Sequence, residues 1–96
     1  MSLGIAGYDV EEDVIEKFDL DIDYGFYVDE VERGSAANLA GILPGDVVVG
    51  MEDEKVLSFD TIKEKMNRQK VGDEVSMQVR REGKIKNFKI KLRKGL

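Results

Sequence analysis

The sequence predicts a mainly β fold of the α+β class, a small β-sandwich or partly open barrel of five to six strands with two short helices. Several segments alternate apolar and charged residues with the period of two that is typical of strands, most clearly over residues 88–93. Turns that contain glycine separate these segments, and other stretches show the three-to-four-residue spacing of helices. With 96 residues the chain is long enough for one core, so we expect a single domain over residues 1–96.

The composition is that of an ordinary soluble globular protein. Apolar residues make up 42% of the chain and charged residues 36%, and no apolar run approaches the ~20 residues that a membrane span needs. We therefore expect no membrane contact by this domain. The sequence has no cysteine, so it does not indicate a redox compartment. We interpret residues 1–3, in part, as a start added for expression.

The formal charge of −5 is unevenly distributed along the chain. Residues 1–60 carry sixteen acids and three bases, whereas residues 61–96 carry four acids and twelve bases. Such a division can indicate a nucleic-acid surface in the basic part. Here the bases of residues 88–93 alternate strictly with apolar residues, which is typical of the solvated face of a strand. We therefore expect no nucleic-acid partner.

A continuous stretch at residues 34–49 predicts a helix, a stop, a turn and a strand in succession. Ser35 can cap a short helix over residues 36–40, because its hydroxyl can accept hydrogen bonds from the free N–H groups of the first turn. Gly41 can adopt the left-handed conformation that ends a helix, and the Pro-Gly pair that follows favours a turn. Three consecutive valines then indicate a buried strand.

The order Gly-Ser-x-Ala-x-x-Ala-Gly-Ile-x-Pro-Gly-Asp-Val-Val over residues 34–48 resembles the signature of bacterial PDZ domains, most closely those that follow the protease domain in HtrA/Deg serine proteases. The family usually has proline after the serine, where this chain has Ala36. The Leu-Gly-Ile of residues 3–5 and the Gly-x-Tyr-Val-x-x-Val of residues 25–31 extend the resemblance to nearly the whole chain. It implies a PDZ-like fold with the circularly permuted strand order of bacterial members.

Residues 9–18 predict a short amphipathic helix that covers the core. Asp9 can cap it, and Glu12, three positions later, can complete a capping box. Acids fill the first turn, and the apolar residues at positions 10, 14 and 18 share one face.

The acidic residues 19–30 raise the alternative of a calcium-binding loop. Acids stand at loop positions one, three, five and twelve, but Tyr24 occupies the sharp-turn position and Gly25 comes one place late. The residues that come next favour a strand, where the motif requires a helix. We interpret residues 19–25 as a surface loop before the strand Phe26–Val31, and a calcium-binding or purely structural domain is the less favoured alternative.

Two hairpins are expected after the buried strand that begins at residues 47–49. In the first, over residues 50–56, the charged pair at 53–54 stands where relatives have Asn-Gly or Asp-Gly, so the turn type stays open. The second turns at residues 82–83 between two alternating strands. The step from Ile85 to Phe88 is odd, which predicts a bulge or a register change between them.

Between the two hairpins, residues 58–67 predict a further helix. Ser58 or Asp60 can cap it, and Phe59, Ile62 and Met66 form an apolar stripe at helical spacing. That stripe is either plain core or, by the resemblance, the second wall of a peptide groove. Which residues face the groove depends on a one-residue difference in phase that the sequence leaves open.

The composition argues against an enzyme. A chain without His or Cys cannot form a Ser-His-Asp triad, a thiol nucleophile or the common zinc sites. Acids are abundant, but no pair stands apart as a general acid and base. We therefore expect no catalytic residue, no metal ligand and no cofactor.

The resemblance implies a binding module instead. A peptide would add as an antiparallel strand, with its terminal carboxylate held by backbone N–H groups and its last side chain in an apolar pocket. The residues implied are Leu3, Gly4 and Ile5 in the carboxylate loop, Ala6 and Gly7 in the pairing strand, and Ile62, Lys63 and Met66 on the groove helix.

The resemblance also implies a context. We expect the regulatory or substrate-recognition domain of an HtrA-like serine endopeptidase outside the cytoplasm, in the cell envelope or at the surface, with a PDZ domain of another bacterial protease or secretion component as the alternative. Expected partners are the C-termini or extended segments of other proteins and the parent protease domain. The chain's own Leu96 could also occupy a neighbouring molecule's groove at high concentration.

Overall fold

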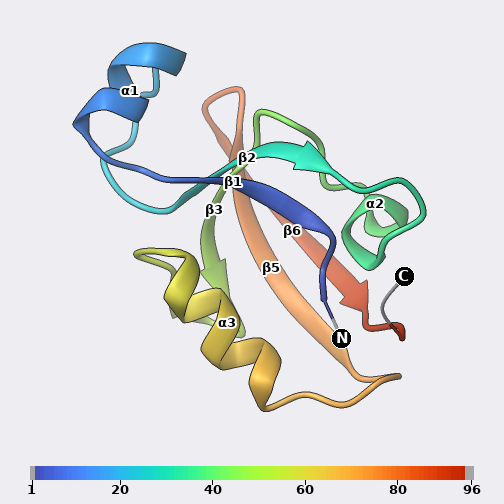
Figure 1. Cartoon of the computed structure of the whole chain (residues 1–96). Coiled ribbons are helices and arrows are strands. Elements are labelled where there is room, and N and C mark those ends of the chain that lie inside the picture. The colour runs from blue at the N-terminus through green and yellow to red at the C-terminus, as the bar shows by residue number, and fades with distance from the viewer. Residues whose placement is uncertain (1, 95–96) are drawn as a thin grey trace.

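The computed structural model describes residues 2–94 and shows a curved antiparallel sheet with three helices around it (Figure 1). The expectations for Met1 and for Leu96 lie outside these residues. In chain order the elements are β1 (Ile5–Asp9), α1 (Glu12–Phe18), β2 (Phe26–Val31), α2 (Ala36–Ala40), β3 (Val47–Met51), β4 (Glu54–Lys55), α3 (Phe59–Asn67), β5 (Glu74–Arg81) and β6 (Lys84–Lys91).

The strand order in the sheet is β1-β2-β3-β5-β6, with the short β4 paired to β3. Strands β1 and β6 are therefore the two edges. This arrangement confirms the expected mainly β, partly open fold. Its three helices lie in the three segments predicted to be helical, residues 9–18, 36–40 and 58–67, although the fold-class prediction counted two. Helix α1 stands apart from α2 and α3 in Figure 1. Within residues 2–94, no helix has the length and apolar content to cross a membrane.

The sheet buries apolar side chains on both faces, because β3 lies at its centre. Each of the five β3 residues is buried, with Val48 in the main core and Val47 and Val49 in a smaller cluster on the other face. The smaller cluster is covered by α1 and the loop after it. The main core lies between the sheet, α2 and α3, and includes Val28, Ile42, Met51, Ile62, Met77, Ile90 and Leu92.

The stretch at residues 34–46 forms as its sequence predicts. The Ser35 hydroxyl accepts a hydrogen bond from the Asn38 N–H at 3.2 Å. Gly41 ends α2 at φ 104°, and the Ile42 N–H then donates back to the Ala37 carbonyl at 3.0 Å. This closure turns Ile42, which is 1% exposed, into the core.

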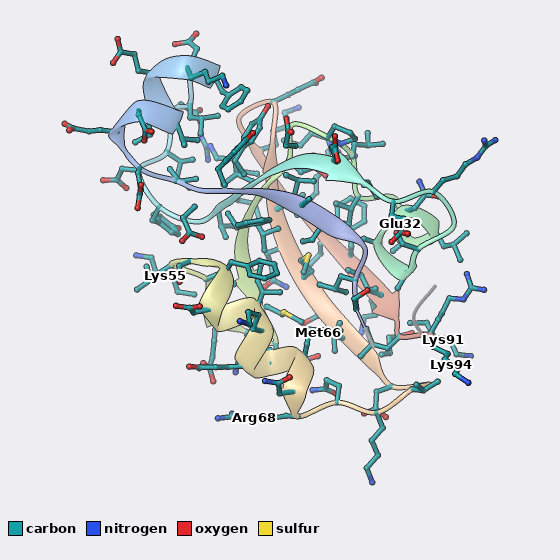
Figure 2. The ribbon with its side chains drawn as sticks, in the orientation of Figure 1. Glu32, Lys55, Met66, Arg68, Lys91 and Lys94 are labelled. Carbon is teal, nitrogen blue, oxygen red and sulfur yellow. The ribbon has the colours of Figure 1, made fainter. Side chains whose placement is uncertain are left out.

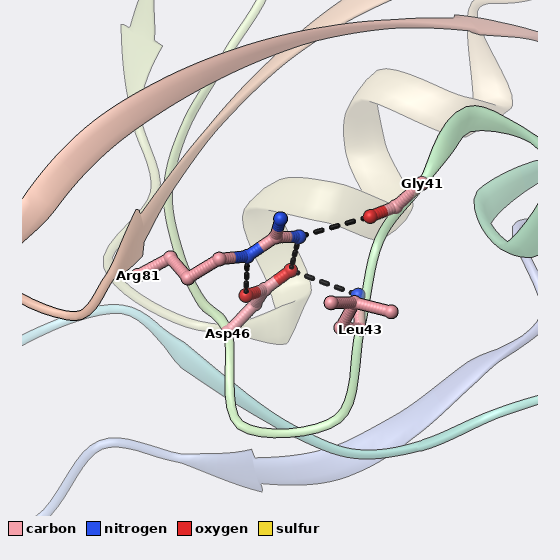
Figure 3. Close-up of polar contacts among 4 residues, drawn as sticks. All are labelled: Gly41, Leu43, Asp46 and Arg81. Carbon is pink, nitrogen blue, oxygen red and sulfur yellow. Dashed lines mark hydrogen bonds and ion pairs between the residues drawn. The ribbon is translucent and has the colours of Figure 1, made fainter.

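A buried ion pair fixes the turn between α2 and β3 (Figure 3). The Asp46 carboxylate, 1% exposed, accepts hydrogen bonds from the Arg81 Nε and Nη2 atoms, both at 2.7 Å. It also accepts from the Leu43 N–H at 2.9 Å, and Arg81 donates to the Gly41 carbonyl at 2.9 Å. The hydrogen bond that Arg81 donates to Asp46 is the main reason that the pKa of Arg81 is raised above its ordinary value. The pair therefore joins the end of β5 to this turn.

The expected cap of the first helix is wrong. Asp9 is the last residue of β1, and α1 begins after Glu11, whose side chain makes no capping hydrogen bond. The Asp9 carboxylate instead accepts from the Phe59 N–H at 2.8 Å. Ser58, one of the expected caps of α3, occupies the N-cap position without a side-chain bond. Asp9 thus accepts a hydrogen bond at the start of α3, fifty residues later in the sequence, because β1 lies beside that helix.

The expected bulge between Ile85 and Phe88 is also wrong. Strands β5 and β6 pair continuously, with Arg80 opposite Ile85 and Met77 opposite Phe88. The odd step places Ile85 on the solvent side, where it is 56% exposed. An uninterrupted ladder with one exposed apolar residue costs less than breaking backbone hydrogen bonds.

Two acidic segments have structures that the sequence left open. The turn between β3 and β4 uses Glu52 and Asp53, one residue before the pair expected at 53–54, and Glu54 already belongs to β4. Their φ values of 51° and 64° are the left-handed geometry of a tight two-residue hairpin. In the loop weighed as a calcium site, Asp21 pairs with Arg80 through two hydrogen bonds of 2.9 and 2.8 Å. The hydrogen bond from Arg80 is the main reason that the pKa of Asp21 lies below its ordinary value.

Candidate functional site

A groove of about 600 Å³ lies between the N-terminal strand and α3. Its walls are largely apolar. Figure 2 shows Met66 on the side of α3 that faces the sheet, whereas Arg68 points away from it. The lining residues are Ser2, Leu3, Gly4, Ile5, Ala6, Glu30, Glu32, Phe59, Ile62, Lys63, Met66 and Asn67.

The structure shows which side chains of α3 face the groove. Ile62 and Met66 are 1% and 9% exposed and form the floor together with Leu3, which is 4% exposed. Lys63 is exposed and lies at the rim. The apolar stripe of α3 is therefore both core and groove wall. Seven of the eight residues expected at the site line this groove.

The eighth, Gly7, lies in an adjoining depression that continues along β1. Ile5, Ala6, Asp9, Phe26 and Phe59 also line this depression. A Cβ atom on Gly7 would lie 1.9 Å from the Tyr27 carbonyl oxygen, so β1 and β2 approach too closely there for any side chain. The pairing register shifts at this point, between Ala6 and Gly7. Glycine is thus required by the strand pairing, whatever lies in the groove.

One end of the groove is formed by Leu3 and Gly4, which precede β1. Gly4 has φ 82°, and a Cβ atom there would lie 2.2 Å from the Cβ of Ser35. The carbonyls of the two residues accept from Ala37 at 3.1 Å and from Glu32 at 2.7 Å, so the loop is held by α2 and β2. Within residues 2–94, neither the Leu3 N–H nor the Gly4 N–H has a hydrogen-bond acceptor. Unpaired successive N–H groups at a left-handed glycine can bind an anion.

Within residues 2–94, the outer edge of β1 is unpaired. β1 bonds to β2 on one side and has no strand on the other within the described chain. Because the Gly4 carbonyl bonds toward β2, the alternation of an antiparallel strand directs the Ile5 backbone groups toward the free edge. The bond between Asp9 and the Phe59 N–H holds the start of α3 beside the other end of this edge. The strand edge and the helix therefore form two walls with a fixed separation.

Among residues 2–94, the charged side chains that line the groove lie at its rims. Glu30 and Glu32 lie on the β2 side and Lys63 on the helix side. On α3, Lys65 binds the Glu54 carboxylate at 2.6 Å, and this hydrogen bond is the main reason that the pKa of Glu54 is lowered. Sequence reasoning missed the two rim glutamates, because their place beside the groove depends on the pairing of β2 with β1.

The chain matches the family model described as PDZ domain over residues 2–92. This chain belongs to the PDZ domain family. A PDZ domain is a non-catalytic module, in agreement with the absence of His and Cys from the sequence.

Relatives of this PDZ domain include HtrA-type serine proteases. A probable periplasmic serine protease do/HhoA-like of Haemophilus influenzae is 36% identical over 94% of this chain, and the chain spans 19% of that relative's length. The HtrA-type protease AlgW, solved with a decapeptide, is 25% identical with a TM-score of 0.86 over 99% of this chain and 30% of its own. The HtrA3 PDZ domain, solved with a phage-derived ligand, has the same fold, with a TM-score of 0.83 and 21% identity over 94% of this chain and 82% of its own.

Proposed function

We propose that this PDZ domain binds the C-terminal or another extended segment of partner proteins by adding it as an antiparallel strand beside β1. One observation carries the proposal: an unpaired strand edge, an apolar groove and unpaired N–H groups meet at one place. Strand addition uses the edge for main-chain hydrogen bonds and the groove for side chains. The decapeptide in the AlgW structure supports this function.

Each part of the site has a chemical role in the proposal. The N–H groups of Leu3, Gly4 and Ile5 bind the terminal carboxylate, and Ala6 and Gly7 pair with the peptide backbone. The floor of Ile62 and Met66 receives the last side chain, which must therefore be apolar. Charge-assisted hydrogen bonds contribute about 1.5–3 kcal/mol and a buried apolar side chain a similar amount, so affinity is modest, around micromolar.

The proposed setting is an HtrA-like serine endopeptidase of the cell envelope, in which this domain recognises substrates or regulates the protease. Two observations support it. The Haemophilus influenzae relative is described as periplasmic, and the matched region is about a fifth of its length. The full reading frame would test this setting, because an HtrA-like protein must encode a catalytic Ser, His and Asp outside the present sequence.

The binding function is tested with two peptides that differ only at the C-terminus. Both end in the same apolar residue, one as a free acid and the other amidated. Amidation removes the anion and keeps the shape, so affinity measured by fluorescence anisotropy should fall at least about tenfold, equivalent to about 1.4 kcal/mol. Amide chemical shifts should change along Ile5–Asp9 and Phe59–Asn67.

Helix α1 provides the internal control, because its residues do not line the groove. Equal binding of the two peptides would contradict the carboxylate mechanism. Shift changes confined to Glu12–Phe18 would contradict the location.

A further inference from the structure

The two rim glutamates occupy a defined place relative to a bound peptide, and their role depends on the proposed binding function. With its carboxylate at the N–H groups of Leu3 and Gly4, the last residue of a peptide lies beside Ile5. Antiparallel pairing then places the penultimate residue beside Ala6 and the third from last beside Gly7. Ile5 packs against the main core, so side chains opposite Ile5 and Gly7 face the groove, and the side chain opposite Ala6 faces outward.

On that outward face, Ala6 pairs with Glu30 of β2. Glu32 follows two positions later, and its N–H bonds to the Gly4 carbonyl at 2.7 Å. Both glutamates are exposed and line the rim of the groove. Neither takes part in an ion pair within residues 2–94. Their carboxylates are therefore available to a group that approaches across β1.

The intervening residues leave the path open. Ala6 has only a methyl group and Gly4 has no side chain, so nothing bulky stands between the penultimate side chain and β2. Neighbouring strands are about 4.8 Å apart, which puts the peptide about 10 Å from β2. An extended lysine or arginine side chain and a glutamate side chain together span that distance.

The helix side of the groove has the opposite charge. Lys63 lies at the rim of α3, one turn after Phe59, whose N–H is bonded to Asp9 at the far end of β1. It therefore lies alongside the part of β1 that would pair with the third residue from the end. A base at that position would meet a like charge, whereas a base at the penultimate position would meet two carboxylates.

We infer that Glu30 and Glu32 make this domain select a basic residue at the penultimate position of its ligand, while Lys63 disfavours a base one position earlier. The ligand class is a C-terminal segment that ends in a basic residue followed by an apolar one. The preference is electrostatic and solvent-exposed, so it weakens as salt shortens the Debye length below the separation of the charges.

The test uses free-acid peptides that share one apolar last residue and carry Lys, Ala or Glu at the penultimate position. At low salt the Lys peptide should bind about fivefold more tightly than the Glu peptide, as expected for exposed ion pairs. In the Glu30→Gln/Glu32→Gln protein, the affinity for the Lys peptide should exceed that for the Glu peptide by less than about twofold. The Glu12→Gln/Glu16→Gln protein has the same net charge but its changes lie on α1, and it should keep the wild-type ratio.

A second peptide series carries the same substitutions at the third position from the end. There the Lys peptide should bind no better than the Glu peptide, because Lys63 is the neighbouring charge. An equal Lys preference at both positions would show attraction to the net charge of −5 and would overturn the inference. Ratios within twofold at the penultimate position, or a preference that survives Glu30→Gln/Glu32→Gln, would overturn it as well. If all peptides bind with equal affinity, only the selectivity fails; if none binds, the proposed function fails and the inference with it.

Discussion

The two edges of the sheet differ in their chemistry. Strand β1 reads Ile-Ala-Gly-Tyr-Asp and has no charge before its last residue, whereas β6 carries lysines at positions 84, 86, 89 and 91. Lysines on an edge strand oppose pairing with another chain, because pairing would require their desolvation. The fold thus leaves open the edge that borders the groove beside α3, whereas lysines protect the opposite edge.

The largest expected effect is on the stability of the sheet that holds the two edges in place. Asp46→Ala leaves the Arg81 guanidinium unpaired, and loss of one partner of a buried pair costs about 3–5 kcal/mol. Arg81 is 22% exposed, so we expect the lower part of that range, measured by urea unfolding. The matched control is Asp21→Ala, which removes an exposed two-bond pair with Arg80 and should shift the unfolding midpoint little. Equal losses in the two variants would contradict a special role for the buried pair.

The next largest effect should come from a methyl group on β1. In Gly7→Ala the new Cβ would lie 1.9 Å from the Tyr27 carbonyl oxygen, so β1 must separate from β2. We expect a loss of about 2–4 kcal/mol of unfolding free energy and a loss of peptide binding.

Gly83→Ala is the control for that change at the β6 hairpin. Gly83 has φ 76°, and apart from its chain neighbours no atom of residues 2–94 lies within 4 Å of the position that an added methyl group would take. Only backbone strain of about 1–2 kcal/mol therefore applies. Peptide affinity should not change. If Gly7→Ala were the milder substitution, the close approach of β1 and β2 would be wrong.

A smaller effect is expected when lysines are removed from the β6 edge. Lys89→Thr/Lys91→Thr removes two charges from β6 and introduces residues that favour strands. The apparent mass from light scattering should rise toward that of a dimer with increasing concentration. Lys17→Thr/Lys70→Thr removes the same charge away from β6 and should stay monomeric. Association of this control would point to net charge rather than to the edge.

The smallest effect concerns pH. Asp21 and Glu54 have lowered pKa values because they accept hydrogen bonds from Arg80 and Lys65, respectively. A depressed carboxyl pKa contributes stability above the ordinary pKa, and this is lost as pH falls through the lowered value, that is, below about pH 4. Both groups are exposed, so the fall in melting temperature attributable to them should be slight. It should be smaller still in Asp21→Asn/Glu54→Gln, and an unchanged acid profile would contradict the assignment.

Local patterns were sufficient to predict much of the fold. The helix, stop and turn at residues 34–46 depend on bonds between residues close in sequence, such as the Ser35 hydroxyl with the Asn38 N–H. The resemblance to PDZ domains identified the groove residues, and the phase of α3 became clear only when its packing against Leu3 was known.

The predictions that failed depend on contacts between distant segments. Asp9 has the sequence context of a local cap, but a strand that places it beside Phe59 offers a different N–H donor. Helical or strand periodicity does not indicate contacts of this kind. The same holds for the pair of Asp46 and Arg81, which are 35 positions apart in the sequence. The bulge predicted near Ile85 failed for a different reason. The prediction assumed that this apolar residue is buried, whereas the pairing of β6 with β5 places it on the solvent face.

The small cluster beneath α1 bears on local unfolding. It contains Val10, Val47 and Val49, and α1 is seven residues long with no side-chain hydrogen bond at its N-cap. A helix so short, held mainly by Ile15 and by the stacking of Phe18 on Tyr27, can open as its own cooperative unit while the main core stays intact. Its amide protons therefore exchange with solvent at a lower free energy than the Val28 N–H, which donates to the Asp46 carbonyl at 2.8 Å in the middle of the molecule. Hydrogen exchange would thus distinguish a slowly exchanging sheet and main core, which hold the groove, from a rapidly exchanging α1 on the other face of the sheet.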